Sequence, residues 1–408
     1  MYDFANSAFP TLITMVAYAV YFTQVVAQGR SDATLLWSVA ISISMILIGI
    51  VSPLVGAMAD SAASKKMWVF VFTAMCVAPT ALLFFVGPGD IVSGTVLFII
   101  ANIGFAGGNG IYNGFLPELT EDSNVGRLSG YGYALGYLGG LIALVICLPL
   151  LSGGLEPEHR TSFKLSFVVA AAFFAIFSAP FFLWLKERAV AQDRPDGVSS
   201  LRAGYARLSE TFHHVRSLTE LFKFLVAFLL YNDGIETVIY FATIFAVSEF
   251  KFSMGDAVIL FIAVQATALV GSILFGHVTD RIGSKPTIVI TLVLWCLVVL
   301  ATYFATTRGQ FWVIALVAGI GLGSNQAASR GLMRLFVPEG RDAEFYAFFS
   351  VMGKFSALLG PMVYGLVATA AGSQRVGILS VLFFFAVGLL ILLTVNVDRG
   401  QAAARSVT

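Results

Sequence analysis

Residues 276–285 of this chain read Gly-His-Val-Thr-Asp-Arg-Ile-Gly-Ser-Lys, and they close an apolar run of helical length. A related stretch at 56–60, Gly-Ala-Met-Ala-Asp, closes an earlier apolar run 220 positions upstream (276 − 56). A second pair of landmarks, Phe-Leu-Pro-Glu at 115–118 and Phe-Val-Pro-Glu at 336–339, recurs with a spacing of 221 (336 − 115). Two landmarks with nearly the same spacing indicate that the chain is an internal duplication.

The composition places both copies in a membrane. Of the 408 residues, 58% are hydrophobic and 12% are charged, against about 25% charged in an average soluble domain. A helix crosses the hydrocarbon core with about 20 apolar residues. The sequence therefore predicts an all-α integral membrane protein with two pseudo-symmetric halves and twelve spans, at 4–28, 34–59, 67–87, 91–115, 128–152, 162–185, 219–248, 255–277, 286–305, 311–333, 343–371 and 376–397.

The domain division follows from the one long polar stretch. Residues 1–185 form the expected N-terminal half, 186–218 a cytoplasmic linker, and 219–408 the C-terminal half. Within the linker, 200–217 has the pattern of a surface helix. Alternating the loops from a cytoplasmic N-terminus puts fifteen Lys and Arg residues inside, five outside and four within spans, which accounts for all 24. Basic short loops face the cytoplasm, so we expect both termini there.

Several functional classes are unsupported by the sequence. A net charge of +1 offers no basic face for nucleic acid. The three cysteines lie in apolar runs, as packing residues do. The sequence has no metal-ligand constellation, no nucleophile elbow and no phosphate loop after a strand, so we predict no cofactor and no enzymatic activity. We also expect the protein to be a monomer. The expected partners are a small-molecule solute, the bilayer and, in one hypothesis, protons.

The stretch at 276–285 resembles the loop signature of the major facilitator superfamily between its eighth and ninth helices. Gly276 lets two helices approach, Asp280 lies at a helix end, and Gly283 permits a tight turn that aims Arg281 and Lys285 at neighbouring helix ends. The first copy keeps the glycine, the acid and, at Lys65 and Lys66, the base, but departs in the turn. The resemblance implies a gating role; the alternative is a pair of ordinary helix ends. The candidate gating residues are Gly56, Asp60, Gly276, Asp280, Arg281, Gly283 and Lys285.

Five further blocks resemble the vacuole-effluxer branch of that superfamily. They begin at Tyr2-Asp-Phe-Ala-Asn, Asn109-Gly-Ile-Tyr-Asn, Leu230-Tyr-Asn-Asp-Gly, Asn325-Gln-Ala-Ala-Ser and Glu344-Phe-Tyr with Gly353-Lys354, in this order. The branch contains the autophagy-linked amino-acid effluxer of fungal vacuoles and bacterial relatives. The resemblance implies efflux of amino acids and, for a bacterial protein, residence in the inner membrane.

Charged residues inside spans are costly and mark functional sites or buried pairs. The candidates are Asp233, Glu236, Arg330 and Lys354. Asp233 falls about 18 Å into the seventh span, near the midplane, at ~1.5 Å per residue. Asp233 and Glu236 share one helix face, and Gly234 allows that helix to bend. The pair either holds a coupling proton in a central cavity or forms a salt bridge with Arg330 or Lys354.

Polar residues of the same blocks complete the candidate site. Their side chains either contact a polar solute or bridge membrane helices. On the fifth span, Gly132, Gly136 and Gly140 recur every four residues and predict close helix packing. The candidate substrate and coupling residues, beyond the four charged ones, are Asp3, Asn6, Asn109, Tyr112, Asn113, Asn232, Asn325 and Gln326.

The leading hypothesis is a secondary active transporter that moves a small polar solute by alternating access, with proton coupling as an option. The alternatives are an exporter of amphipathic compounds, which Phe-rich spans suit, and a lipid-handling protein of the flippase kind.

The start of the chain raises one more hypothesis. Asp3 and Asn6 have the same spacing as Asp233 and Glu236, yet only two residues precede Asp3. Equal depth in both halves requires roughly ten more residues at ~1.5 Å each. We therefore expect a longer native N-terminus; the alternative is a genuine start with Asp3 in interfacial water.

Overall fold

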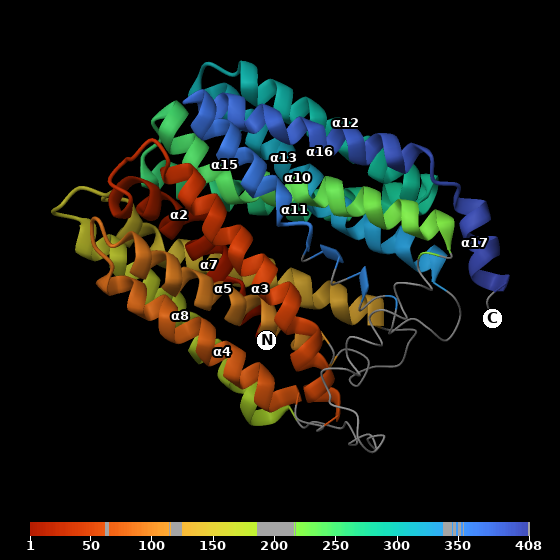
Figure 1. The fold of residues 1–408 in the computed structure, drawn as a ribbon, viewed down its shortest axis with the longest axis horizontal. Helices are drawn as coiled ribbons and strands as arrows, with labels where there is room; N and C mark the ends of the chain where they lie inside the picture. Colours follow the sequence, from red (N-terminus) through yellow and green to blue (C-terminus); the bar gives the residue numbers. More distant parts are fainter. Residues whose placement is uncertain are drawn as a thin grey trace. The chain divides into compact units, whose positions relative to one another are not determined.

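The computed structural model describes residues 1–61, 65–113, 115, 125–185, 216, 218–337, 345, 348–349, 352–353 and 355–406. All regular secondary structure in these ranges is helical (Figure 1). In the described chain, nine helices are long and apolar enough to cross a membrane, and three shorter apolar helices cover Ala33–Gly49, Leu135–Leu151 and Leu359–Ala371. Each of the twelve expected spans overlaps one of these helices, so the all-α membrane fold is confirmed.

The first compact unit comprises Met1–Arg207 with Tyr240–Val247 and Lys251–Ile262. Inside it, α4 packs on α5 and α8, and the first turn of the chain, α1, packs on α7 and α8. Its helices are α1 (Tyr2–Asn6), η1 (Phe9–Val16), α2 (Ala17–Tyr21), η2 (Phe22–Val26), α3 (Ala33–Ser61), α4 (Lys65–Leu82), η3 (Leu83–Phe85), α5 (Ile91–Asn113), α7 (Val125–Leu151) and α8 (Arg160–Trp184).

The second unit comprises Leu208–Ile239, Ser248–Phe250 and Ala263–Thr408. Inside it, α12 lies beside α13 and α16, and α15 lies beside α16 (Figure 1). The division at 186–218 stays a prediction, because 186–215 and 217, with the expected surface helix, lie outside the described residues. The remaining helices are α10 (Thr219–Phe250) and α11 (Met254–Ile282), which contribute to both units, and α12 (Ser284–Phe304), α13 (Arg308–Phe336), α15 (Leu359–Ala371), α16 (Gln374–Leu393) and α17 (Val397–Ser406).

The first span is helical as expected, but its winding changes along its length. Two π-helical segments, η1 and η2, alternate with the short α-helices α1 and α2. Pro10 lies in the first turn of η1 and has no backbone N–H to donate. The regular helix expected at 4–28 is therefore a helix of mixed winding, a feature that is frequent at functional sites.

The eleventh span, expected at 343–371, is interrupted by a turn. Residues 356–358 form a turn, and α15 begins only at Leu359. No side chain of the preceding turn caps α15. The N–H groups at the start of α15 therefore need partners from another helix, because they have none in their own.

Candidate functional site

In the first unit, the chain's first helix and α5 are joined by two polar pairs. The Tyr112 hydroxyl donates a hydrogen bond to Oδ2 of Asp3 at 2.6 Å. Nδ2 of Asn6 donates to Oδ1 of Asn109 at 3.4 Å, which is a long and weak bond. In each helix the two residues are three positions apart, so the pairs lie one turn from each other. We call these four residues the first-helix polar contact; the sequence predicted all four, and the fold brings them together.

Tyr2 supports this contact, although it was not among the predicted site residues. Its ring lies 4.7 Å from the ring of Tyr112, measured between centroids. Its hydroxyl shares a 2.9 Å hydrogen bond with Oγ1 of Thr73 in α4. Tyr2 is 2% exposed, so it fixes the direction from which Tyr112 reaches Asp3. Its place at the head of the Tyr-Asp block was the signal available in the sequence.

In the second unit, the carboxylate of Asp233 binds the start of α15. Its Oδ1 accepts from the Gly360 N–H at 2.9 Å, and its Oδ2 accepts from the Leu359 N–H at 3.2 Å. Asp233 has no exposed surface. The first N–H groups of a helix lack partners within the helix, and the helix dipole favours an anion there. Asp233 therefore caps the N-terminus of α15, which has no capping side chain of its own.

Neighbours of Asp233 on α10 hold the turn that precedes α15. Nδ2 of Asn232 donates to Oγ of Ser356, and that Oγ donates to the Gly353 carbonyl at 2.7 Å. Glu236 lies one helical turn beyond Asp233 and is half-buried. Lys354, the fourth predicted charged residue, lies outside the described residues. Asn232 thus binds the turn at 356–358, and Asp233 binds the first N–H groups of the helix that follows it.

The predicted residues of α13 lie at different depths in the second unit. Asn325 is 1% exposed, and its Nδ2 donates to Oγ1 of Thr291 in α12 at 3.0 Å. Gln326 and Arg330 are half-buried on the same helix. Asn325 therefore bridges two helices of its own unit. Asn113 ends α5, and its side chain lies outside the described part of the chain.

The loop signature ties helix ends together within each unit. Gly283 has φ +89°, a backbone conformation that favours glycine. Beyond this turn, Nζ of Lys285 donates to the carbonyls of Leu393 and Val395, at 3.1 and 2.6 Å, where α16 ends. In the first unit, Nζ of Lys66 donates at 2.7 Å to the Leu185 carbonyl, where α8 ends.

The other predicted gating residues lie on the helices next to these turns. Arg281 is exposed in the last turn of α11. Gly56 and Asp60 belong to α3, and Gly276 and Asp280 belong to α11; nothing of these four side chains is described. The ties of Lys66 and Lys285 were visible in the sequence only as a general tendency of cations to lie near helix C-termini.

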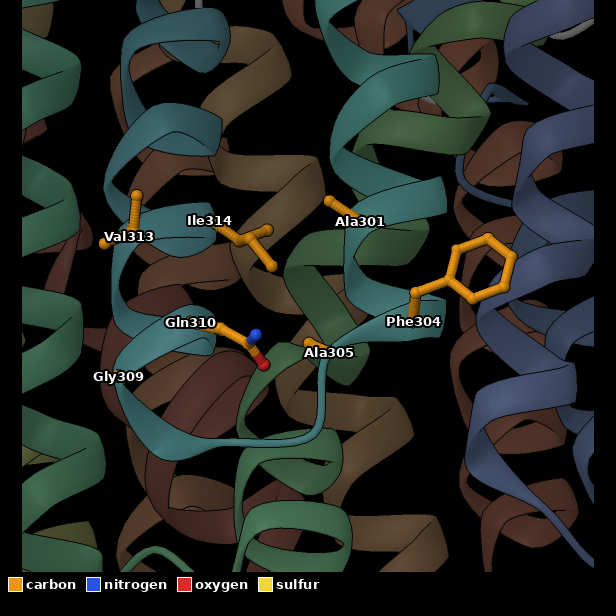
Figure 2. A pocket seen from close by; sticks show the side chains of 7 residues that line it. All are labelled: Ala301, Phe304, Ala305, Gly309, Gln310, Val313 and Ile314. Atoms are coloured by element: carbon orange, nitrogen blue, oxygen red, sulfur yellow. The ribbon is translucent and has the colours of Figure 1, made fainter.

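A hollow of about 510 Å³, which none of these residues lines, lies where α12 turns into α13 (Figure 2). Its polar side chain, Gln310, already accepts hydrogen bonds at Oε1 from the N–H groups of Thr306 and Thr307. The remaining lining is apolar: Ala301, Phe304, Ala305, Gly309, Val313 and Ile314. This hollow therefore lacks the polar groups expected for recognition of a polar solute.

A known protein family matches almost the whole chain. The family described as vacuole effluxer Atg22 like matches residues 18–405. The chain belongs to this family. It is 27% identical to the uncharacterized MFS-type transporter YxiO of Bacillus subtilis over 96% of this chain and 92% of that protein. It is 26% identical to autophagy-related protein 22 of Yarrowia lipolytica over 78% of this chain, but the match covers only 58% of that longer relative.

Solved structures confirm the fold of this Atg22-like chain. A bacterial homolog of the human lysosomal transporter Spinster, in an inward-facing and unoccupied conformation, superposes with a TM-score of 0.73 at 14% identity, covering 99% of this chain and 96% of that one. A mutant form of the nucleoside transporter NupG superposes with a TM-score of 0.72, also at 14% identity, covering 97% of this chain and 98% of that one. The chain is a multi-pass membrane transporter of the major facilitator type.

Proposed function

We propose that this Atg22-like protein is a secondary active transporter that moves a small polar solute by alternating access, with efflux of an amino-acid-like solute as the leading case. The first-helix polar contact carries this proposal. A carboxylate, a phenol and two amides at one helix pair inside the spans are expensive in lipid, and they offer both donors and acceptors to a solute with charged or amide groups.

The relatives support the direction of transport. The matched family is described as vacuole effluxers, and a fungal member is an autophagy-related protein. The full-length match to a bacterial relative supports residence in a bacterial inner membrane. The loops at 56–60 and 276–285 are the proposed gates, both termini are proposed to be cytoplasmic, and the working unit is proposed to be a monomer.

Proton coupling is proposed to involve Glu236. It is half-buried on α10 and lies one turn from Asp233, which is already bonded to two N–H groups. A carboxylate with partial access to water can exchange a proton during a transport cycle. Glu236→Gln should insert normally, lose proton-driven transport and keep solute exchange. An unchanged pH dependence of transport in vesicles would remove Glu236 from the coupling step.

The substrate class is tested in two steps. Purified protein is first screened for thermal stabilisation by amino acids, nucleosides, sugars and organic ions, since a ligand of the folded state raises the melting temperature. Counterflow of the radiolabelled hits is then measured in proteoliposomes. Wild-type protein is compared with Asn109→Ala, which removes a solute-facing amide in this proposal, and with Asn325→Ala, which removes an amide already bonded to Thr291.

The outcomes separate the hypotheses. Accumulation of an amino acid that Asn109→Ala weakens and Asn325→Ala leaves unchanged supports the proposal. Movement of a fluorescent lipid without counterflow of any polar solute favours a lipid-handling protein. Binding and transport of amphipathic compounds alone favours the exporter, and either result overturns the polar-solute proposal.

A further inference from the structure

The helices α8, in the first unit, and α16, in the second, each carry an arginine in their first turn, and the two arginines have different surroundings. Arg375, near the start of α16, is held by three hydrogen bonds. Its Nε donates to Oε2 of Glu249 at 2.8 Å, and Nη1 donates to the Tyr303 and Ala305 carbonyls. The guanidinium also lies 5.3 Å from the ring centroid of Phe250. In the second unit, this position holds a cation next to an anion.

Arg160, the first residue of α8, has no such partner. Its Nε is buried and has no hydrogen-bond acceptor among the described residues. The side chain as a whole is half-buried. A buried N–H of a charged group without an acceptor is unfavourable by more than a neutral one. Nε of Arg160 therefore lacks an acceptor, and an anion would suit it best because the guanidinium is positively charged.

A second cation lies beside Arg160. Lys164 follows four positions later, on the same face of α8, and the two positive charges act on each other. Its ammonium lies 5.3 Å from the ring centroid of Phe84. One acid, Asp90, influences Lys164 electrostatically, but its Oδ2 accepts from the Gly87 N–H in its own loop at 2.8 Å.

Residues of the first helix and of the loop with Asp90 surround Arg160 and Lys164. The Tyr21 hydroxyl lies within electrostatic range of Arg160 and donates to the Val86 carbonyl at 2.9 Å. The loop that carries Asp90 is fixed to the end of the first helix, because the Gly89 N–H donates to the Val26 carbonyl at 2.9 Å. Two cations therefore lie in fixed surroundings on one end of the first unit.

We propose that Arg160 and Lys164 bind the phosphate group of an anionic ligand at the end of the first unit where α8 begins. A guanidinium fork and an ammonium together match the oxygens of a phosphate, and a phosphate relieves the repulsion between the two cations. Glu249 supplies the corresponding anion to Arg375 from within the chain. The phosphate comes either from a lipid headgroup or from free phosphate in solution.

The experiment has two arms and uses the full chain in neutral detergent. In the first, the melting temperature is measured in phosphate and in chloride at equal ionic strength; free phosphate should raise it by about 3 °C at saturation. In the second, protein from vesicles of phosphatidylglycerol or of phosphatidylcholine is analysed by native mass spectrometry for retained lipid.

Variants locate the binding group. Arg160→Gln and Lys164→Gln should each abolish the phosphate shift or the retention of phosphatidylglycerol over phosphatidylcholine. Arg30→Gln is the control, because Arg30 is exposed and already bonded to Asp32. Arg160→Lys keeps the charge and removes the fork, and it should bind at least tenfold more weakly. It also keeps the test open if Arg160→Gln fails to fold.

Each result has one meaning. A shift with free phosphate assigns a soluble ligand, and selective retention of phosphatidylglycerol assigns a lipid headgroup. No response of folded wild-type protein in either arm overturns the proposal. An equal response of wild-type protein and Arg160→Gln, or of wild-type protein and Lys164→Gln, overturns it as well.

Discussion

The start of the first helix and the middle of α10 share one local arrangement: an aspartate whose carbonyl accepts from a hydroxyl four residues later, next to a glycine of another helix. Oγ of Ser7 donates to the Asp3 carbonyl at 2.7 Å, and Oγ1 of Thr237 donates to the Asp233 carbonyl at 2.6 Å. In each unit, this helical turn also packs against a glycine of another helix. A Cβ on Gly136 of α7 would lie 3.0 Å from Oγ of Ser7, and a Cβ on Gly360 of α15 would collide with Oγ1 of Thr237.

The carboxylates of the two copies nevertheless have different partners. Asp3 accepts from the Tyr112 hydroxyl of α5, whereas Asp233 accepts from backbone N–H groups of α15. The cause is the neighbouring helix. α7 passes through Gly136 as one helix, so its N–H groups there are used within the helix; α15 begins one residue before Gly360. An acid in a predicted span can therefore stabilise an interruption between helices.

The largest expected effect concerns Asp233. Asp233→Ala leaves two buried N–H groups without an acceptor and removes two charged hydrogen bonds, at a cost of about 3–5 kcal/mol in the free energy of unfolding. Asp3→Ala removes one such bond in a half-buried setting and should cost less than half as much. Unfolding in a mixed-detergent titration measures both. Equal losses would mean that the contacts to α15 do not distinguish the copies.

Asp233→Asn sharpens the same comparison. Asparagine keeps one carbonyl oxygen for Gly360 or Leu359 but loses the charge that favours the helix N-terminus, so we expect an intermediate loss of about 1–2 kcal/mol. The same mixed-detergent titration measures it. A loss as large as that of Asp233→Ala would show that charge, rather than the number of hydrogen bonds, stabilises the break.

Substitution of Gly136 and Gly360 tests how closely the neighbouring helix approaches each aspartate. Gly360→Ala forces a methyl group against Thr237 and the Asp233 carboxylate, and overpacking of this kind costs about 1–3 kcal/mol. Gly136→Ala meets Ser7 and Asp3 at 3.0–3.8 Å and should cost clearly less. The melting temperatures of the two variants provide the measurement. A larger loss for Gly136→Ala would contradict the closer approach of α15.

Removal of a single hydroxyl tests the first copy. Tyr112→Phe deletes the hydrogen bond to Asp3 but preserves the ring contact with Tyr2, and we expect a loss of roughly 1–2 kcal/mol. Asn109→Ala removes only the long bond to Asn6 and should cost less. Unfolding titrations of both variants rank the two pairs; the opposite order would make the amide pair the stronger link.

The smallest effect is expected at the loop signature. Lys285→Met and Lys66→Met each remove a cation that bonds to carbonyls at a helix end, of α16 and of α8 respectively, a contribution of about 0.3–1 kcal/mol. Arg281→Met, at an exposed position in the last turn of α11, is the control and should not change the melting temperature. A loss in only one of the two lysine variants would show that the ties are not equivalent.

The sequence by itself determined the membrane class and the order of the spans, and it predicted the duplication. It also named the four residues of the first-helix polar contact as candidates, without pairing them. These features are local or periodic. Apolar runs identify spans because every backbone polar group must be satisfied within the helix in lipid. Asp3 with Asn6 and Asn109 with Tyr112 each share a helix face through their spacing, and the repeated landmarks needed only to be counted.

The tertiary structure alone decided which groups the acids contact. The turn at 356–358 lies within an apolar region that hydropathy reads as one span, so nothing local marked Leu359 as a helix start. The partners of Asp233 are 126 and 127 positions away in sequence. Likewise, only the fold shows that Nε of Arg375 donates to Glu249, whereas Nε of Arg160 has no acceptor in the described chain. Spacing along one helix fixes a residue's face, but the donor or acceptor opposite that face depends on where a distant helix begins and ends.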